Sequence, residues 1–437
     1  MLTAAHVPSS AAAQLNSNRY SIDLFTSPVL GPARIVGMGG AHLAIATGID
    51  GATYNPVGYA ERAEKEIDFF AFDITGGIWL GGLFRRNDFD NNGRAGLSST
   101  DTVQLMLGTR YQFAQFGTGV TALARIYTLR DEAGRNSADL TLITVRAGAG
   151  YAFWDGGLVV GGGMVFTAFD LAPINSSRSL VAFRGYGAEV GALIRPKHKR
   201  YRIGTTFHTP ISSRPRTDES MVGSDGIRRA EGLVVPESVD VPWDMGVGFA
   251  YQFGERRSNV PWRNTRELRR EVRRQILSGS YQPPATQGEA DFAVLPQDIE
   301  KAVDTAVENY RESQRRLRRN QPRRYMLLAA DLLVYGKTPR GQSISAFLLQ
   351  TPERSGAKIS YSVRVGMESE VWQDRMKVRV GSYLEPSRVD RKFYRPHGTL
   401  GLEARLFDFW RWSARGTATI DVAPRYFNWG LAVGLWW

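Results

Sequence analysis

The residues with the clearest potential for chemistry form one acidic run, Asp88-Phe89-Asp90-Asn91-Asn92-Gly93. Its first, third and fifth positions carry carboxylate or amide oxygens and its sixth is glycine, which matches the front half of a calcium-binding loop. The bidentate glutamate that such a loop needs at its last position is replaced by Ser99. Asp88, Asp90 and Asn92 are therefore an incomplete candidate for a structural calcium site, and the alternative is an ordinary loop rich in Asp, Asn and Gly.

Catalytic chemistry finds little support in the sequence. Cysteine is absent, which excludes a thiolate nucleophile, a disulfide framework and a Cys-ligated metal site. GxSxG and HExxH motifs are absent too. The histidines have neither the spacing of metal ligands nor an evident nucleophile beside them: His6, His42, His198, His208 and His397. We predict that the protein is not an enzyme and has no cofactor apart from the calcium candidate.

Composition and charge restrict the fold and the partners. Hydrophobic residues make up 43% of the chain, yet no apolar run reaches the roughly 18 residues of a membrane-spanning helix. The strands of a membrane barrel need only about ten residues each and alternate in polarity, so that class stays open. Half of the net charge of +12 lies in 255–324, and the rest forms no basic stripe. Nucleic acid is therefore not an expected partner.

From about residue 66 onward, apolar and polar residues alternate with the period of two that gives a strand two different faces. In 358–371, for example, Tyr361 and Val363 oppose Ser362 and Arg364. An even number of strands suits a closed antiparallel barrel whose two chain termini lie on the same side. The pattern predicts fourteen: 66–86, 101–113, 116–130, 138–153, 157–170, 180–195, 200–211, 238–253, 325–337, 358–371, 376–384, 397–407, 412–422 and 427–437.

The connections between these strands alternate between short and long. The long, polar ones are 131–137, 171–179, 212–237, 338–357 and 385–396. Aromatic residues cluster beside the short ones: Phe113, Phe116, Trp154, Trp372, Phe407, Phe409, Trp410 and Trp412. Short turns at one end, long loops at the other and an aromatic band at one interface are typical of bacterial barrels. We therefore predict an all-β transmembrane antiparallel barrel of about 14 strands, surrounded by lipid in the outer membrane of a Gram-negative bacterium.

The last predicted strand supports this localisation. Its apolar residues share one face and end in an aromatic residue: Phe427, Trp429, Leu431, Val433, Leu435 and Trp437. Such a strand resembles the signal by which outer-membrane barrels are recognised for insertion.

At the other end of the chain, residues 1–14 contain a small-residue run without a basic segment before it, and we interpret them as a signal-peptide remnant or a disordered tail.

A compact segment rich in small residues precedes the first strand. Residues 31–60 contain Gly37-Met38-Gly39-Gly40-Ala41 and later Asn55-Pro56, a turn or helix-start signal. This segment resembles the N-terminal region of the FadL/PorV superfamily of outer-membrane proteins, although Val57 stands where members commonly have Ala. We predict a lumen plug over 15–65 and a barrel over 66–437.

The resemblance implies one of two functions. FadL-type members take up hydrophobic molecules such as long-chain fatty acids through a plugged fourteen-stranded barrel. PorV-like members do not transport and instead bind protein partners in secretion complexes. A FadL-type route needs an opening in the wall. Either Gly76-Gly77 or Gly161-Gly162-Gly163 is a candidate for the strand kink that supplies it, since glycine weakens a strand. The alternative is that these glycines only relieve crowding inside the barrel.

Many charged residues are predicted to face the lumen, and their mixed signs indicate a salt-bridged interior rather than an ion-selective pore: Arg110, Arg146, Arg184, Glu189, Arg364, Glu368, Glu370, Lys377, Arg379, Glu403, Arg405, Arg415 and Asp421. Residues 255–324 break the alternation with two stretches of helical spacing, 266–277 and 297–319. By strand parity this basic insert leaves the barrel at the short-turn side, which is periplasmic. It is either a docking arm for a periplasmic partner or a solvated helical excursion.

Overall fold

The structure is a computed structural model of the 437-residue chain. It describes residues 15–25, 28–62, 69–81, 87–88, 90–93, 98–130, 138–174, 178–218, 220–256, 258–260, 265–280, 299–319, 322, 325–373, 375–389, 394–409 and 412–436, without the side chains of 100, 101, 315, 317–319, 409, 412 and 436. The segment 1–14, the aromatic residue Trp410 and the terminal Trp437 therefore lie outside the described residues.

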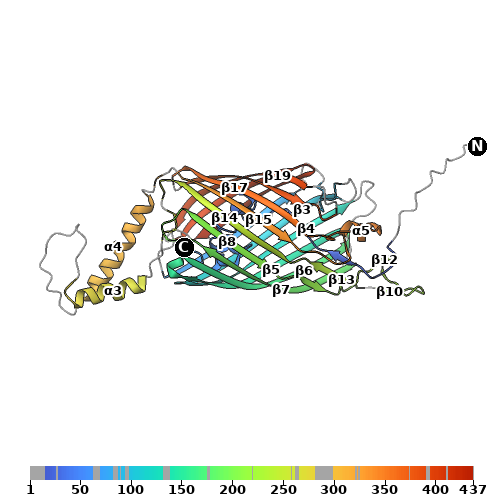
Figure 1. Ribbon diagram of the computed structural model, residues 1–437, viewed down its shortest axis with the longest axis horizontal. Coiled ribbons are helices and arrows are strands. Elements are labelled where there is room, and N and C mark those ends of the chain that lie inside the picture. The colour runs from blue at the N-terminus through green and yellow to red at the C-terminus, as the bar shows by residue number, and fades with distance from the viewer. Residues whose placement is uncertain are drawn as a thin grey trace, which may run out of the picture.

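Fourteen antiparallel strands close into one barrel (Figure 1). They are β2 (Phe70–Gly81), β3 (Ser98–Phe113), β4 (Phe116–Arg130), β5 (Ala138–Phe153), β6 (Leu158–Pro173), β7 (Val181–Ile194), β8 (Tyr201–His208), β14 (Asp244–Gly254), β15 (Tyr325–Tyr335), β17 (Ser360–Trp372), β18 (Met376–Pro386), β19 (Tyr394–Phe409), β20 (Trp412–Ala423) and β21 (Tyr426–Trp436). Each corresponds to one segment predicted from the alternation, so the predicted fold is confirmed. The described part of the segment predicted over 66–86 forms one strand, β2.

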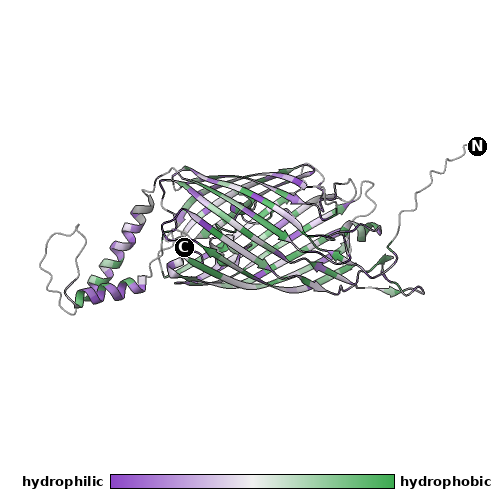
Figure 2. Cartoon of the chain, viewed as in Figure 1, coloured by the Kyte–Doolittle hydropathy of each residue, from purple (hydrophilic) through white to green (hydrophobic). Residues whose placement is uncertain are grey.

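The alternation places apolar side chains outside the barrel and polar ones inside. Figure 2 shows hydrophobic and hydrophilic residues interspersed along the strands. On β17, Tyr361, Val363 and Val365 are each almost half exposed, whereas Arg364 and Glu368 are buried. An apolar exterior around a polar interior is the reverse of a soluble barrel and is the arrangement of a barrel that spans a membrane. Among the described residues, no helix combines the length and hydropathy that a membrane span would require.

The same alternation corrects one predicted lumen charge. Arg184 is exposed, while its neighbour Phe183 and the more distant Glu189 are buried. Residues 184 and 189 are separated by an odd number of positions, so an unbroken strand cannot direct both side chains into the lumen. Arg184 therefore lies on the outer face.

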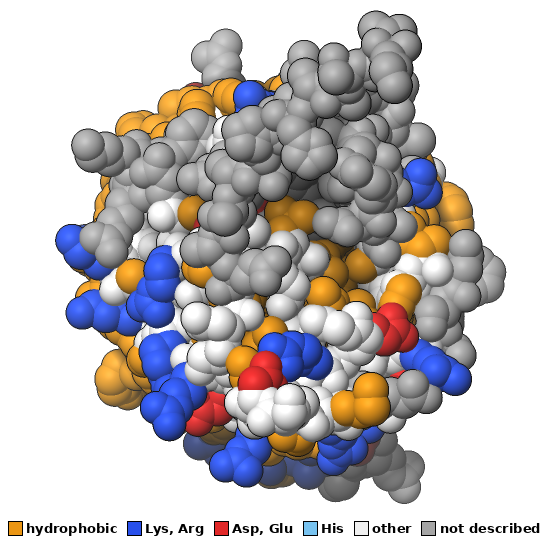
Figure 3. Space-filling view, turned by 90° about the vertical axis from the view of Figure 1, so that its right-hand side faces the viewer, with side chains coloured by type: hydrophobic (Ala, Val, Ile, Leu, Met, Phe, Trp, Pro, Cys, Tyr) orange, Lys and Arg blue, Asp and Glu red, His pale blue; other side chains and the backbone are white. Residues whose placement is uncertain are grey.

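The two ends of the barrel differ, as predicted. One end, called here the short-turn end, has tight connections such as Ala114–Gln115 between β3 and β4. Aromatic side chains near it are exposed as an outer band: Phe113, Phe116, Tyr151, Phe153, Trp154, Phe253, Trp372 and Phe407. The opposite end, called the long-loop end, is viewed directly in Figure 3, where basic side chains gather along part of the rim. Bacterial barrels place short turns in the periplasm and long loops outside the cell.

Residues 28–62 fill the lumen as the predicted plug. They form α1 (Ala33–Gly37), α2 (Gly48–Ala52) and the 3-10 helix η1 (Pro56–Tyr59), most of whose residues are buried. Before the plug, β1 (Ser21–Asp23) pairs in parallel with β13 (Ser238–Val241) and β16 (Gly341–Gln342), and β9 (Ile211–Ser213) completes this sheet. The sheet joins loops of the long-loop end, so the chain crosses the lumen before β2 begins at the short-turn end.

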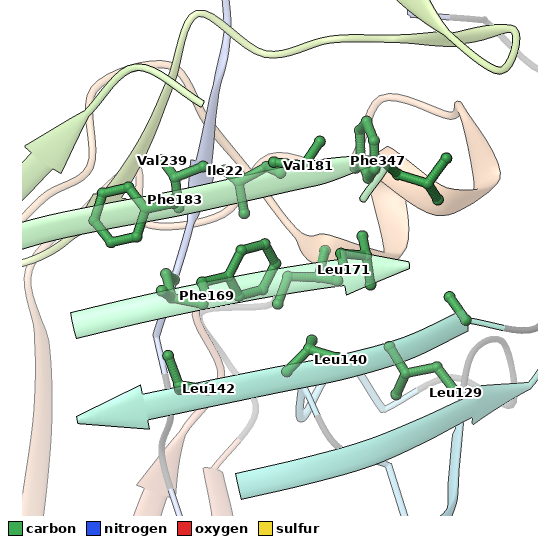
Figure 4. Close-up of a cluster of buried hydrophobic side chains, with 14 of the residues drawn as sticks. Ile22, Leu129, Leu140, Leu142, Phe169, Leu171, Val181, Phe183, Val239 and Phe347 are labelled. Atoms are coloured by element: carbon green, nitrogen blue, oxygen red, sulfur yellow. The ribbon is translucent and has the colours of Figure 1, made fainter. Parts of the chain in front are cut away.

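A buried apolar cluster occupies the long-loop half of the lumen. Figure 4 shows Ile22 of β1 and Val239 of β13 against side chains of the wall strands, including Leu140, Phe169 and Phe183. Phe347 of α5 (Ile344–Leu349) belongs to the same cluster. A small sheet of β10 (Met221–Val222), β11 (Arg228–Ala230) and β12 (Leu233–Val234) lies at this end as well.

The basic insert forms two helices outside the barrel, α3 (Thr265–Leu277) and α4 (Ile299–Arg319), beyond its short-turn end (Figure 1). Their apolar stripes pack against each other through Leu268 and Val272 of α3 and Val303 and Val307 of α4. Arg269 pairs with Asp304 and Arg273 with Glu300 across the two helices. The predicted helices are confirmed, and their apolar faces cover one another.

Candidate functional site

A cavity of about 160 Å³ lies between the plug and the wall strands. Its apolar lining includes Leu24, Phe25, Leu30, Met106, Leu123, Leu142, Val165, Ile211, Val241 and Leu333. Its polar lining includes Tyr54, Arg125, Arg146, His208, Asp244, Tyr335 and Arg364. Several of the apolar residues belong to the cluster of Figure 4. The site therefore combines an apolar wall with a few charged groups, which suits an amphipathic ligand.

Arg364 is the unusual charged group of this cavity. The residue is only 4% exposed, and its Nη2 donates a hydrogen bond to the Tyr335 hydroxyl at 2.9 Å. Its Nη1 is buried and has no hydrogen-bond partner among the described residues. The ion pairs that the structure describes give Arg364 no carboxylate, although arginine keeps its charge in proteins and burial of an unpaired charge is costly. Asp331, opposite Arg364 on β15, interacts with it electrostatically, but the described ion pairs do not join the two, and Asp331 instead accepts hydrogen bonds from the plug backbone.

The other charged groups of the cavity are better compensated. Arg146 forms an ion pair with Glu189. His208 lies between two carboxylates, with Nδ1 2.7 Å from Asp244 and Nε2 3.4 Å from Glu189. These groups neutralise one another within the lumen, whereas Arg364 is a cation of the cavity that takes part in none of the described ion pairs.

Wall carboxylates hold the plug. Asp331 accepts hydrogen bonds from the backbone N–H groups of His42, at 2.8 Å, and Leu43, at 2.9 Å. Arg34 on α1 pairs with Glu368 of the wall at 3.1 Å. These bonds fix the plug to the wall at several points. Each involves a charged group, and charge-assisted hydrogen bonds are among the stronger polar contacts.

The glycines of the predicted plug motif lie against the wall and the cavity. Gly39 has φ +61°, and a Cβ there would come 2.6 Å from the backbone nitrogen of Ser382. Gly40 has φ +76°, and a Cβ there would come 2.8 Å from Nη1 of Arg364. The motif Gly37-Met38-Gly39-Gly40-Ala41 is buried in the lumen. Its small residues thus permit close backbone approach, and at Gly40 the guanidinium of Arg364 occupies the space that a Cβ would take.

Asn55-Pro56 starts the 3-10 helix η1, as its turn signal predicts. Asn55 Oδ1 accepts a hydrogen bond from the N–H of Val57 at 3.3 Å, and its Nδ2 donates to the carbonyl of Leu43 at 3.1 Å. Proline occupies the first helical position, where its missing N–H costs nothing. The Val57 that departs from the family pattern is fully buried.

At Gly76-Gly77 the strand pairing is continuous. β2 keeps an unbroken register with β3 and with β21 across both glycines. A Cβ on Gly77 would lie 2.5 Å from the ring of Trp79, whose buried side chain faces the lumen. This geometry agrees with the interpretation that the glycine relieves crowding, and an opening at this position stays a prediction.

The acidic run at 88–93 lies in the connection between β2 and β3. Asp88 accepts hydrogen bonds from the backbone N–H of Asn92, at 3.2 Å, and of Gly93, at 3.0 Å. Asp90 accepts from the Ser345 hydroxyl at 2.6 Å and from the Asn92 amide at 3.3 Å. Burial, together with the nearby Asp88 carboxylate, raises the pKa of Asp90 to about 8. Within the described residues, no group of three or more His, Cys, Asp or Glu side chains is arranged to hold a metal.

Sequence reasoning finds only part of this site. The period of two predicts that Arg364 faces the lumen. It does not reveal the roles of Tyr335, Tyr54 and the pair His208 and Asp244, because their proximity depends on the register between strands distant in sequence and on the position of the plug.

The fold is shared with solved transport proteins. A Pseudomonas aeruginosa FadL homologue is 11% identical, with a TM-score of 0.51 over 94% of this chain and 99% of that chain. The Ralstonia pickettii toluene transporter TbuX gives 11% and 0.50 over 94% and 98%. The monoaromatic hydrocarbon channel CymD gives 11% and 0.51 over 94% and 96%. The resemblance predicted from 31–60 is thus confirmed for the fold. No family model and no curated protein sequence matches the chain.

Proposed function

We propose that the protein admits small hydrophobic molecules with an anionic head group, such as fatty acids, passively across the outer membrane of a Gram-negative bacterium. The proposal is supported by the closed barrel with an internal plug and by the shared fold with a toluene transporter and a monoaromatic hydrocarbon channel. The cavity between plug and wall is the proposed binding site.

One observation carries the proposal: the buried guanidinium of Arg364 forms none of the described ion pairs, keeps Nη1 without a described hydrogen-bond partner, and lines an otherwise largely apolar cavity. A ligand carboxylate would pair with this cation, and its alkyl chain would contact residues such as Leu333 and Val165. A hydrogen bond to a charged group contributes about 1.5–3 kcal/mol. A ligand without an anion would leave Nη1 of Arg364 without a charge-assisted partner, so the site favours anionic amphiphiles over neutral hydrocarbons.

The cavity accommodates only part of such a ligand. Its volume of about 160 Å³ is smaller than the roughly 300–1,000 Å³ of ligand pockets that enclose a drug-sized molecule. It can hold the head group and the first carbons of a chain. Leu24, Phe25 and Leu30, which precede α1, line the cavity and must shift to admit the rest. We therefore infer that binding and movement of this segment are coupled.

The test is equilibrium binding of radiolabelled oleate to the purified barrel in detergent. Oleate should bind saturably, oleyl alcohol should bind more weakly, and Arg364→Gln should reduce oleate affinity about tenfold without affecting the alcohol. Lys358→Gln, which changes an exposed cation outside the cavity, is the control. Equal affinity of the wild type and Arg364→Gln for oleate would contradict the proposed site.

A PorV-like scaffold is the second candidate, and the helical hairpin favours it. α3 and α4 extend beyond the barrel, and Arg270 and Arg274 on α3 are exposed. Such an arm is suited to an acidic periplasmic partner. A scaffold would keep its cellular role in the Arg364→Gln variant and lose it when the hairpin is removed, whereas a transporter would show the opposite pattern.

A further inference from the structure

The outer wall carries a groove on its membrane-facing side. Its volume is about 720 Å³, and it crosses β14, β15, β17 and β18. It is lined by Phe249, Tyr251, Phe253, Leu328, Ala329, Ala330, Val365, Gly366, Met367, Val380, Gly381 and Ser382. The lining is apolar except for the Ser382 and Tyr251 hydroxyls. The groove is separate from the lumen cavity, whose lining residues it does not share.

Strand register explains the groove. Phe249, Ala330, Val365 and Ser382 are paired from one strand to the next and form a single row across the outer face. The adjacent row is Tyr251, Leu328, Met367 and Val380. Side chains at such cross-strand positions are direct neighbours. The small side chain of Ala330 therefore leaves a depression between the larger Phe249 and Val365.

The depth of the groove in the membrane follows from strand geometry. Arg375 lies in the turn between β17 and β18 at the short-turn end, six residues before Gly381. Six residues of strand span about 20 Å, and a barrel strand is tilted by about 40°. The groove thus reaches roughly 15 Å from the turn along the membrane normal, which is half of the roughly 30 Å hydrocarbon core. This reach along the membrane normal equals the thickness of one leaflet.

The rim beside this groove has groups suited to a lipid head. Arg375 is exposed, and the ion pairs that the structure describes do not involve it. Trp372, at the end of β17, is 61% exposed. Aromatic side chains favour the membrane interface, and arginine binds phosphate oxygens in a bidentate manner.

From these observations we propose that the groove binds one phospholipid of the leaflet at the short-turn end. One acyl chain lies across Ala330 between Phe249 and Val365, and the lipid phosphate pairs with Arg375. The barrel would then carry a specific lipid on its outer wall in addition to any ligand in its lumen.

Native mass spectrometry of the purified barrel with 1-palmitoyl-2-oleoyl-phosphatidylglycerol tests the proposal. The wild type should retain one lipid at detergent concentrations that remove the others. Ala330→Phe, which fills the groove, should reduce retention about tenfold, and so should Arg375→Gln. The controls are Ala188→Phe and Arg184→Gln, which make the same changes at exposed positions on β7.

Two results would overturn the proposal. Equal lipid retention by Ala330→Phe and Ala188→Phe would show that the groove contributes only non-specific lipid contact. Undiminished retention by Arg375→Gln would refute the phosphate contact. Oleate binding measured on the same variants separates this site from the lumen cavity, because Ala330→Phe should leave oleate affinity unchanged.

Discussion

The Tyr335 hydroxyl accepts a hydrogen bond from Nη2 of Arg364 at 2.9 Å, inside the lumen and beside the plug. The two residues lie on neighbouring strands, β15 and β17, and both line the cavity. This bond orients the guanidinium while its Nη1 stays without a partner among the described residues. The pair therefore holds a cation in place for an anionic ligand.

Replacing Tyr335 by Phe tests this relationship. The hydroxyl proton of Tyr335 is free to reach a ligand carboxylate, and the hydroxyl oxygen fixes Arg364. A hydrogen bond to a charged group contributes about 1.5–3 kcal/mol, so we expect Tyr335→Phe to weaken oleate binding by at least about tenfold. Oleyl alcohol affinity should change less. An unchanged oleate affinity would show that Tyr335 has no part in recognition.

A second prediction concerns Gly40. Its φ of +76° disfavours a side chain, and so does the 2.8 Å distance at which a Cβ would meet Arg364. Gly226 has a similar φ of +74°, and a Cβ built there would have no atom within 4 Å. Gly226→Ala therefore measures only the conformational cost of placing a non-glycine residue at positive φ. A left-handed conformation costs a non-glycine residue about 1–3 kcal/mol. Gly40→Ala should lower the stability of the barrel by more than Gly226→Ala in denaturant titrations. Equal losses would show that the space beside Arg364 is not tightly constrained.

We predict that the local stability of the acidic loop at 88–93 depends on pH. Because the pKa of Asp90 is raised to about 8, the folded loop favours the protonated carboxyl. The stabilisation of the folded loop by protonated Asp90 is fully present below the unfolded pKa of about 4 and is lost as pH rises through about 8. The protection of the described loop residues, which is their hydrogen-exchange rate relative to the intrinsic rate at each pH, should therefore fall between about pH 5 and about pH 9, and Asp90→Asn should remove much of this trend. A wild-type loop that becomes more protected at high pH would contradict the assignment.

The calcium candidate can be tested on the same loop. Asp88 already accepts two backbone N–H groups, so we expect equal protection in calcium and in chelator. A calcium-dependent gain in protection at high pH that Asp90→Asn abolishes would instead establish an ion site at Asp88, Asp90 and Asn92.

Deleting residues 262–319 should leave the barrel inserted and heat-resistant on gels. The apolar faces of the two helices cover each other, and one described contact of α3 with the chain before β2 is Arg266 over the ring of Phe69, 3.6 Å from its centroid. One cation–π contact contributes about 0.5–1 kcal/mol at an exposed site. Failure of the shortened protein to insert would show that the hairpin is needed for assembly.

Much of the barrel can be predicted because each strand has an apolar and a polar face, and that difference is visible residue by residue. The small residues of 31–60 predict the plug, and Gly39 and Gly40 do lie where a Cβ would collide. The pairing of Ser21 with Ser238 is not predictable, because it joins residues far apart in sequence. The unpaired state of Arg364 is not predictable either, since it depends on which side chains of other strands and of the plug face it.

Uptake by cells tests the central claim most directly. The protein, its Arg364→Gln variant and its Lys358→Gln variant would be produced at equal surface levels in a Gram-negative host without its own outer-membrane fatty-acid channel. Initial rates of radiolabelled oleate uptake would then be measured. We predict uptake with the wild type and Lys358→Gln, and a rate about tenfold lower with Arg364→Gln. Uptake by the wild type no faster than by cells lacking the protein would contradict the proposed function.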